Sequence, residues 1–240
     1  MPQAAIVIPQ NPPTIRLHQL YAGKTLHYPE HEPSAIAKSP ITDSRMVKAL
    51  GIDGDEQYEK RFHGGIDRAL CHYPREHYDY WKQQYPHLAH LFQSPAFGEN
   101  ISTSGLTEEN AFMGDVYQLG DAIIQITQPR SPCYKLNYHL QVPHLSEEMQ
   151  NNGYCGWLYR VIKEGNIHPE SQMTLLSRTG TVSVKEALSI AFTEPFSEER
   201  TLILLSSPGL STSWTRTMQM RLINRVIEPF SYRLFNRAPS

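Results

Sequence analysis

Short runs in which apolar and polar residues alternate are typical of residues 14–180. Residues 15–20 alternate as a half-buried strand does. Residues 122–127 are rich in β-branched side chains and predict a further strand. Two helices interrupt the strands, one over residues 74–81, where a proline suits the first turn, and one over about residues 146–151. This part of the chain therefore predicts a β-rich α+β domain.

A helical segment is expected over residues 181–240. Ser183 and Glu186 form a capping box that predicts the start of a first helix. Ser197 is the expected cap of a second helix, and Ser213 of a third. Each of these helices is too short to be stable alone, so we expect a small three-helix bundle that packs internally or on a partner.

The third of these helices carries both an apolar stripe and three arginines. The stripe, with a spacing of four residues, consists of Trp214, Met218, Leu222 and Val226. The arginines are Arg216, Arg221 and Arg225. A DNA-reading helix also carries arginines, but the chain as a whole is not basic, so we expect these three to form a solvated face.

Composition narrows the classes of function. The 240 residues are 40% hydrophobic, which suits one large domain with a smaller appendage. The formal net charge of −2 argues against a nucleic-acid polymer as partner. The 11 histidines are scattered, without the spacing of a structural zinc site. Three cysteines (Cys71, Cys133 and Cys155) do not resemble a secreted disulfide framework, so we expect a cytoplasmic protein.

Residues 1–13 predict an N-terminal tail. Their apolar stretch, residues 4–8, has no basic region before it, and three prolines follow closely. This pattern fits neither a signal peptide nor a membrane span, so no membrane partner is expected. A loose tail and an edge strand are the two interpretations of the stretch.

The surroundings of Cys133 make it the strongest candidate for chemistry. Pro129 and Pro132 restrict the backbone of this loop, which follows the predicted strand directly. Arg130 and Lys135 flank the thiol, and positive charge favours the thiolate, which attacks electrophiles and binds metals. No helix N-terminus is expected behind the loop.

Residues 62–70 contain a second candidate site. Gly64 and Gly65 let backbone amides approach a ligand closely and favour an anion-binding concavity. His63 can donate a hydrogen bond to an anionic oxygen. Arg68 is a candidate partner for a neighbouring aspartate or for a ligand phosphate.

Residues 97–101 and 153–159 are weaker candidates. Glu99 is either a proton donor or a charge partner, and Asn100 has donors and an acceptor that suit the edge of a heterocycle. The aromatic residues within 153–159 either flank a flat ligand or form ordinary core. Cys155 has no cation beside it in the sequence, so we expect a structural thiol.

Taken in order, these segments resemble the MOSC family, whose domain is found at the C-terminus of molybdenum cofactor sulfurases. The motifs that carry the resemblance are Gly-Ile-Asp-Gly-Asp at 51–55, His-Gly-Gly-Ile-Asp-Arg-Ala-Leu at 63–70, Phe-Gly-Glu-Asn at 97–100 and Pro-Arg-Ser-Pro-Cys-Tyr-Lys at 129–135. The resemblance covers nearly the whole chain and extends to members with a short helical tail. It implies a barrel-like MOSC fold for residues 14–180.

The resemblance also implies a molybdenum cofactor, that is, molybdenum bound to molybdopterin, with Cys133 as the protein ligand to the metal. The residues expected to contact the cofactor are His63, Gly64, Gly65, Arg68, Asn100, Arg130, Ser131, Tyr134 and Lys135. His63 is the first candidate for a proton source and Glu99 the second. Thiolate is a soft ligand that suits a metal already held by sulfur atoms.

The activity implied by the resemblance is reduction of N-hydroxylated bases such as 6-N-hydroxylaminopurine, from N–OH to N–H, as a detoxification. This reduction needs two electrons, and no flavin, haem or iron–sulfur motif is evident in the chain. A separate flavoprotein is therefore implied as the electron donor. The helical tail either docks this partner, forms a homodimer or covers one side of the barrel.

Two alternatives stay open at this stage. The chain could be a carrier that hands on the molybdenum cofactor or a sulfur atom without reducing a substrate. It could also be a thiol hydrolase in which Cys133 and a histidine form a dyad.

Overall fold

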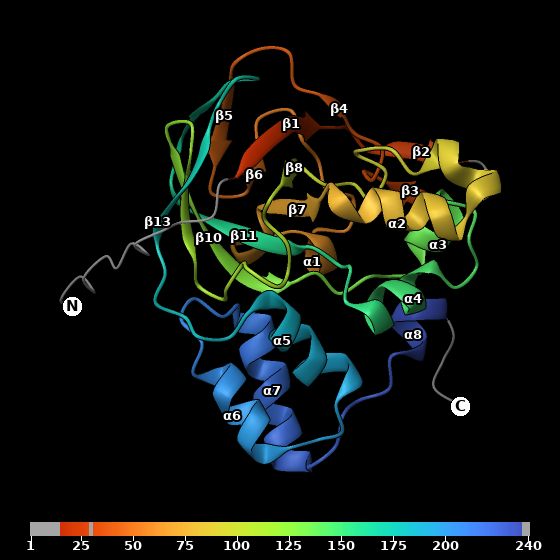
Figure 1. Cartoon of the computed structure of the whole chain (residues 1–240), viewed down its shortest axis with the longest axis vertical. Helices are drawn as coiled ribbons and strands as arrows, with labels where there is room; N and C mark the ends of the chain where they lie inside the picture. Colours follow the sequence, from red (N-terminus) through yellow and green to blue (C-terminus); the bar gives the residue numbers. More distant parts are fainter. Residues whose placement is uncertain (1–14, 29–30, 237–240) are drawn as a thin grey trace.

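A curled, mostly antiparallel sheet of eight strands contains most of the core (Figure 1). The structure, a computed structural model, describes residues 15–28 and 31–236, so the predicted N-terminal tail lies outside the described residues. The strand order is β13-β9-β10-β11-β7-β8-β1-β4, and among these pairs β7 and β8 alone run parallel. Two small sheets, β12-β5-β6 and β2-β3, complete the β structure of the described residues.

The strands are β1 (Arg16–Ala22), β2 (Leu26–Tyr28), β3 (His31–Ser34), β4 (Ser39–Pro40), β5 (Arg45–Lys48), β6 (Gly51–Ile52), β7 (Leu70–Pro74), β8 (Ile101–Ser104), β9 (Val116–Leu119), β10 (Ala122–Pro129), β11 (Trp157–Lys163), β12 (Gly165–Ile167) and β13 (Met173–Ser177). The two strands expected from the sequence are confirmed as β1 and β10. The β-rich α+β fold with a curled sheet followed by helices is confirmed as well.

Helices within the first three quarters of the chain connect the strands. They are α1 (Lys60–His63), η1 (Ile66–Arg68), α2 (Glu76–Gln84), η2 (Pro86–Leu91), α3 (Lys135–His139) and α4 (Leu145–Asn152). The helix predicted over 74–81 exists but begins later, because Pro74 still pairs with Thr103 as the last residue of β7. The helix predicted over 146–151 is confirmed as α4.

The helical tail lies against one end of the sheet (Figure 1). It consists of α5 (Val184–Leu188), the π-helical turn η3 (Ser189–Thr193), α6 (Glu198–Leu205), α7 (Thr212–Asn224) and α8 (Ser231–Phe235). Two predicted caps are confirmed, since the side chain of Ser183 accepts from the Glu186 amide at 3.0 Å and that of Ser197 from the Arg200 amide at 3.3 Å. The short helix α8 was not expected.

The cap of α7 is two residues earlier than predicted. The Ser211 hydroxyl, not that of Ser213, accepts from the Trp214 amide at 3.2 Å. Asp67 adds a carboxylate at the same helix start, where its Oδ2 accepts from the Thr212 amide at 2.9 Å. A negative charge at a helix N-terminus is favourable. The reason for the different start therefore lies in a residue of the preceding domain.

The expectation that Arg221 faces solvent was wrong. Its side chain is buried, donates to the Ala191 carbonyl at 2.9 Å and forms a two-point ion pair with Glu228. Arg216 and Arg225 are exposed as expected. The apolar stripe is also shorter than predicted, because α7 ends at Asn224 and leaves Val226 outside the helix and exposed.

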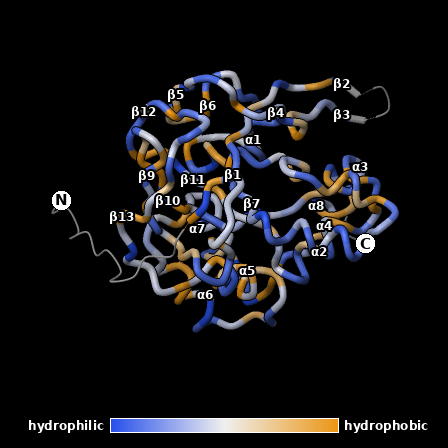
Figure 2. Tube along the Cα trace, turned by 45° about the horizontal axis from the view of Figure 1, so that its top comes forward, coloured by the Kyte–Doolittle hydropathy of each residue, from blue (hydrophilic) through white to orange (hydrophobic). Residues whose placement is uncertain are grey.

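Aromatic side chains fill much of the core, and apolar residues are distributed through both the sheet region and the tail (Figure 2). Trp157 and Tyr159 are fully buried on β11, so residues 153–159 contribute ordinary core rather than the wall of a flat ligand. Cys155 is buried too, and its Sγ lies 3.1 Å from the Met149 carbonyl. Burial raises the pKa of this thiol, which agrees with the expected structural role.

Among the residues that the structure describes, no helix combines the length and the apolar character that a membrane crossing would need.

His72, inside the sheet, predicts a pH-dependent stability. Its ring nitrogens lie 2.9 Å from the Tyr159 hydroxyl and 2.8 Å from the Thr103 hydroxyl, and burial lowers its pKa from 6.5 to about 3. The unfolded chain therefore binds a proton that the folded chain excludes between these pH values, so the free energy of unfolding falls as the pH drops below 6.5. We expect His72→Gln to reduce this slope by about 1.4 kcal/mol per pH unit between roughly pH 4 and 6 in denaturant titrations.

The matched control for this measurement is His87→Gln, because His87 is exposed. This variant should keep the slope of the unmodified chain. Equal slopes for His72→Gln and the unmodified chain would contradict the prediction.

Candidate functional site

Cys133 lies in the loop that follows β10, next to the point where β10 and β11 end their pairing. Pro129 pairs with Trp157, and the Arg130 amide donates to the Gly156 carbonyl at 3.0 Å, so pairing continues to the edge of the loop. The loop then enters α3, whose first turn includes a bond from the Leu136 amide to the Cys133 carbonyl at 3.1 Å. The expectation that no helix begins behind the thiol was wrong, because this five-residue helix has too short a pattern to be evident in the sequence.

Cys133 and His63 meet across the site. The Cys133 Sγ lies 3.7 Å from the His63 Nε2, and the cysteine is half-buried. His63 ends α1 and is followed by the Gly64-Gly65 pair that the sequence singled out. Gly65 has a φ of +97°, and a Cβ atom added there would meet nothing within 4 Å. The thiol thus lies beside an open, glycine-lined stretch of backbone.

Three cations surround the imidazole of His63. Partial burial, and then the positive charges of Lys135, Arg130 and Arg68, lower the pKa of His63 from 6.5 to about 4. The residue keeps contact with solvent. The imidazole is therefore neutral at pH 7 and accessible, which suits a hydrogen-bond partner better than a ready source of protons.

The side chain of Arg130 is fixed by a backbone carbonyl outside the cysteine loop. Its Nη1 donates to the Phe97 carbonyl at 2.5 Å, and its charge acts on the thiols of Cys71 and Cys133 and on Glu99. Within the described part of the chain, no carboxylate forms an ion pair with this guanidinium. A mostly buried cation without a carboxylate partner favours an anion in its vicinity.

Tyr134 and Lys135 connect the cysteine loop to the β2–β3 hairpin. Both bind Glu32 Oε2, the Tyr134 hydroxyl at 3.1 Å and the Lys135 Nζ at 3.0 Å. Hydrogen bonds from these two groups lower the pKa of Glu32. Sequence reasoning missed Glu32, since nothing near it in the chain resembles a site motif. Ser131 lies half-buried in the same loop.

Glu99 lies behind the site. It is fully buried, and its Oε1 accepts from the Tyr78 hydroxyl at 2.6 Å and from the Ser94 hydroxyl at 2.7 Å. Its Oε2 is buried and has no hydrogen-bond partner among the described residues. Burial raises the pKa of this carboxyl, so it holds a proton more readily than an exposed glutamate does.

Asn100 has a structural task in the fold. Its Oδ1 accepts from the Cys71 amide at 3.0 Å, and its Nδ2 donates to the Tyr21 carbonyl at 3.1 Å and to Asp55 at 2.9 Å. Asp55 in turn forms a buried ion pair with Lys38. The amide that the sequence offered for a heterocycle is thus occupied by the strands around it. Its contact with a cofactor stays a prediction.

The side chain of Arg68 also binds residues of the sheet and the tail. Its Nη2 donates to the Ser213 hydroxyl on α7 at 2.8 Å, and its Nε lies 3.4 Å from Gln128 Oε1. The neighbouring Asp67 pairs with Arg160 at 2.7 Å. This motif therefore joins the sheet to the tail, while the Arg68 charge still acts on His63.

Besides Glu32, the sequence interpretation missed two further groups near the site. Cys71 keeps partial solvent contact on a central strand, and the charge of Arg130 acts on its thiol. Arg233 on α8 contacts the cysteine loop from the tail. Neither has a local signal, because each is brought to the site by pairing between segments far apart in the chain.

The described residues contain no group of three or more His, Cys, Asp or Glu side chains that could hold a metal ion. A metal at Cys133 would therefore have to arrive with most of its ligands.

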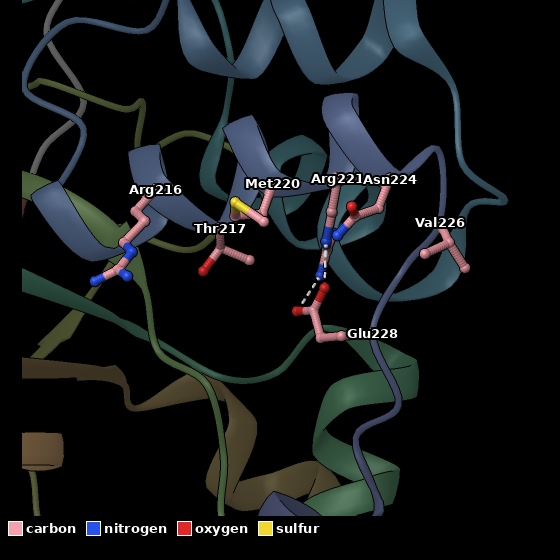
Figure 3. A pocket seen from close by; sticks show the side chains of 7 residues that line it. All are labelled: Arg216, Thr217, Met220, Arg221, Asn224, Val226 and Glu228. Carbon is pink, nitrogen blue, oxygen red and sulfur yellow. Dashed lines mark hydrogen bonds and ion pairs between the residues drawn. The ribbon is translucent and has the colours of Figure 1, made fainter.

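A separate pocket with a volume of about 290 Å³ lies beside α7 (Figure 3). It is lined by Arg216, Thr217, Met220, Arg221, Asn224, Val226 and Glu228. Its buried cation, Arg221, is already neutralised by Glu228, and the lining has no thiol or imidazole. We therefore assign the candidate site to the Cys133 loop.

Comparison with known proteins agrees with this fold and with the helical tail. Residues 59–174 match the family model of the MOSC domain, and residues 182–225 match that of the YiiM-like, 3-alpha helix domain. Protein YiiM of Escherichia coli (strain K12) is 53% identical over 218 residues, covering 91% of this chain and 97% of that protein. The crystal structure of YiiM from Escherichia coli superposes with a TM-score of 0.80 at 46% identity, covering 90% of this chain and 96% of that chain.

A further relative carries a functional name. A Gibberella moniliformis protein named "Reductase" is 36% identical over 146 residues, which cover 60% of this chain and 26% of that protein. The chain belongs to the MOSC family, in the branch that carries the YiiM-like helical tail. The family resemblance expected from the sequence is thereby confirmed.

The role of Asn100 in the fold is testable without any ligand. We expect Asn100→Ala to lower the free energy of unfolding by roughly 2–4 kcal/mol, because the buried Cys71 amide and Asp55 carboxylate each lose a partner. Chemical denaturation of the purified chain measures this change, with Asn166→Ala at an exposed position as control. An unchanged stability would mean that the Asn100 amide is not needed by the fold.

Proposed function

We propose that this chain is a molybdenum-cofactor-dependent reductase of N-hydroxylated bases such as 6-N-hydroxylaminopurine. The net change is R–NHOH plus two electrons and two protons to R–NH₂ plus water. The observation that carries the proposal is the position of the Cys133 thiol, beside His63 and among the charges of Arg130 and Lys135. Membership of the MOSC family and the relative named "Reductase" support oxidoreductase chemistry.

The residues fit an anionic cofactor that brings its own metal. The accessible thiol supplies one soft ligand, and Arg130 supplies a positive charge without a carboxylate partner among the described residues. The backbone at Gly65 is open to a close approach. When bound, the molybdenum cofactor would supply the two-electron chemistry, and the protein would supply binding, orientation and electrostatics.

In this proposal each residue has a stated task. Cys133 holds the metal, while Arg130, Lys135 and Arg68 attract the negative charge of the cofactor. Lys135 has to exchange part of its contact with Glu32 for the ligand. His63, neutral at pH 7, donates or accepts a hydrogen bond next to the thiol.

Glu99 is the better placed of the two candidates to store a proton, because burial raises its pKa. Its carboxyl lies behind Arg130, whose charge acts on it. A proton from this position needs a relay to the substrate.

The electrons have to come from outside the chain. The same proposal includes a separate flavoprotein as electron donor and a cytoplasmic location for both proteins. It also includes a homodimer that forms through the helical tail.

The low pKa of His63 bears on the hydrolase alternative. A cysteine–histidine dyad uses an imidazole that accepts the thiol proton and is then stabilised as a cation. Here three neighbouring positive charges oppose that cation. The geometry at 3.7 Å permits contact, but the electrostatics favour a neutral imidazole.

The test starts from protein made in a host that synthesises the molybdenum cofactor. We expect bound molybdenum and pterin, and formation of adenine from 6-N-hydroxylaminopurine with reduced methyl viologen as electron source. Cys133→Ser should lower turnover by roughly 100-fold or more and reduce the bound molybdenum, since it removes the soft ligand. Metal analysis and product chromatography measure both effects.

Cys155→Ser is the matched control, because this thiol is fully buried, lies 3.1 Å from the Met149 carbonyl and cannot reach a bound metal from the solvent side. It should retain metal and turnover. Bound cofactor that passes to an apoenzyme without any adenine formed would identify a carrier instead. Activity toward esters in metal-free protein would identify a thiol hydrolase.

A further inference from the structure

The C-terminal helix α8 lies against the cysteine loop rather than against the other tail helices alone. The Leu234 carbonyl accepts from the Asn137 side chain on α3 and from the Ser146 hydroxyl on α4, each at 3.1 Å. Figure 1 shows α8 next to α4 and away from α6. The two family-model matches end at residues 174 and 225, so α8 lies beyond both.

One residue of α8 contacts the backbone on both sides of Cys133. The Arg233 Nη1 donates to the Pro132 carbonyl, and the Arg233 carbonyl accepts from the Tyr134 amide at 2.9 Å. The peptide before the cysteine and the amide after it are thus fixed by the same residue. Since these two peptides set the direction of the Cα–Cβ bond, they set where the thiol points.

The rest of the tail fixes Arg233 in turn. Its guanidinium carbon lies 4.9 Å from the centre of the Phe192 ring and 5.2 Å from that of the Phe230 ring. Its Nη2 donates to Gln150 Oε1 at 2.5 Å. A planar guanidinium presents its donors to two acceptors in a rigid fork while it stacks on aromatic rings, whereas the single ammonium of a lysine lacks this fixed geometry.

We infer that Arg233 is a positioning residue that orients the Cys133 thiol, which makes the helical tail a working part of the proposed active site. The inference rests on the proposed function for its catalytic consequence. Its structural premise concerns the loop alone. Arg233 contacts the peptides next to Cys133, so its loss should leave the affinity for substrate unchanged and disturb the placement of the metal ligand.

The first measurement is hydrogen exchange of the loop in protein without cofactor. Arg233→Met keeps an apolar stem against Phe192 and Phe230 but loses the guanidinium bonds to Pro132 and Gln150. We expect amide exchange over residues 134–137 to become roughly 10-fold faster or more, since the loop opens more often. Arg233→Lys should give an intermediate rate.

The second measurement uses the loaded enzyme. Turnover per bound molybdenum should fall by roughly 10- to 100-fold in Arg233→Met, because a displacement of about 1 Å at a reacting centre has effects of this size. The KM for 6-N-hydroxylaminopurine should not change. Arg221→Met is the matched control, since it removes a buried arginine of the tail that contacts Glu228 and Ala191 but not the cysteine loop.

The outcomes are distinct. Equal exchange over residues 134–137 in Arg233→Met and the unmodified chain overturns the inference. Unchanged turnover per bound molybdenum in Arg233→Met also overturns it. The same holds if Arg221→Met, at an equal loss of thermal stability, speeds exchange in the loop as much as Arg233→Met does, because Arg233 would then only support the tail in general. If the unmodified, loaded protein reduces nothing, the proposed function fails, whereas the exchange data still decide whether Arg233 fixes the loop.

Discussion

The site depends on a positive charge that the fold holds near the cysteine loop without a carboxylate partner. Arg130 is mostly buried, donates to the Phe97 carbonyl, and forms no carboxylate ion pair within the described residues. Removing a charge from water is costly unless an opposite charge compensates for it. The charge of Arg130 interacts with the thiols of Cys71 and Cys133 and with the carboxyl of Glu99. The positive charge of Arg130 thus favours an anionic guest in the space next to the cysteine loop.

The same field explains how the two candidate proton groups differ. His63 lies on the solvent side among three cations, and its pKa is lowered to about 4. Glu99 lies inside the protein, where burial raises its pKa. His63 is therefore neutral near pH 7, while Glu99 holds its proton more readily than an exposed glutamate does. Neither group forms an ion pair with Arg130 among the described residues, so the charge of this guanidinium is available to an anionic guest.

Local sequence signals predicted the elements that local interactions determine. The caps at Ser183 and Ser197 are bonds over three residues, and the strand at β10 follows from its β-branched run. The start of α7 was predicted two residues late, because a carboxylate from Asp67 contributes to it across the chain. Arg221 was expected to face solvent, since a helical pattern does not show that Glu228 folds back to pair with it.

The candidate site divides in the same way. Cys133 and His63 could be found from their motifs, and the fold brings them to 3.7 Å. Asn100 and Arg68 have equally distinctive motifs, yet their side chains bind the strands and the tail. A motif alone does not separate a residue that contacts a ligand from one that holds the ligand site together, because both are tied to the same geometry.

The tail shows why the cysteine loop needs support from a distant segment. Two prolines restrict the loop, but they also remove two amide donors, so its backbone has fewer internal bonds to keep one conformation. Besides the turn that starts α3, the loop is held from outside, through the Tyr134 side chain by Glu32 on β3 and through its backbone by Arg233 on α8. A loop that is held by two elements far from it in the chain orients its thiol only in the complete fold. The metal-binding geometry proposed here is therefore a property of the whole chain, tail included, and the short cysteine motif is its most visible part.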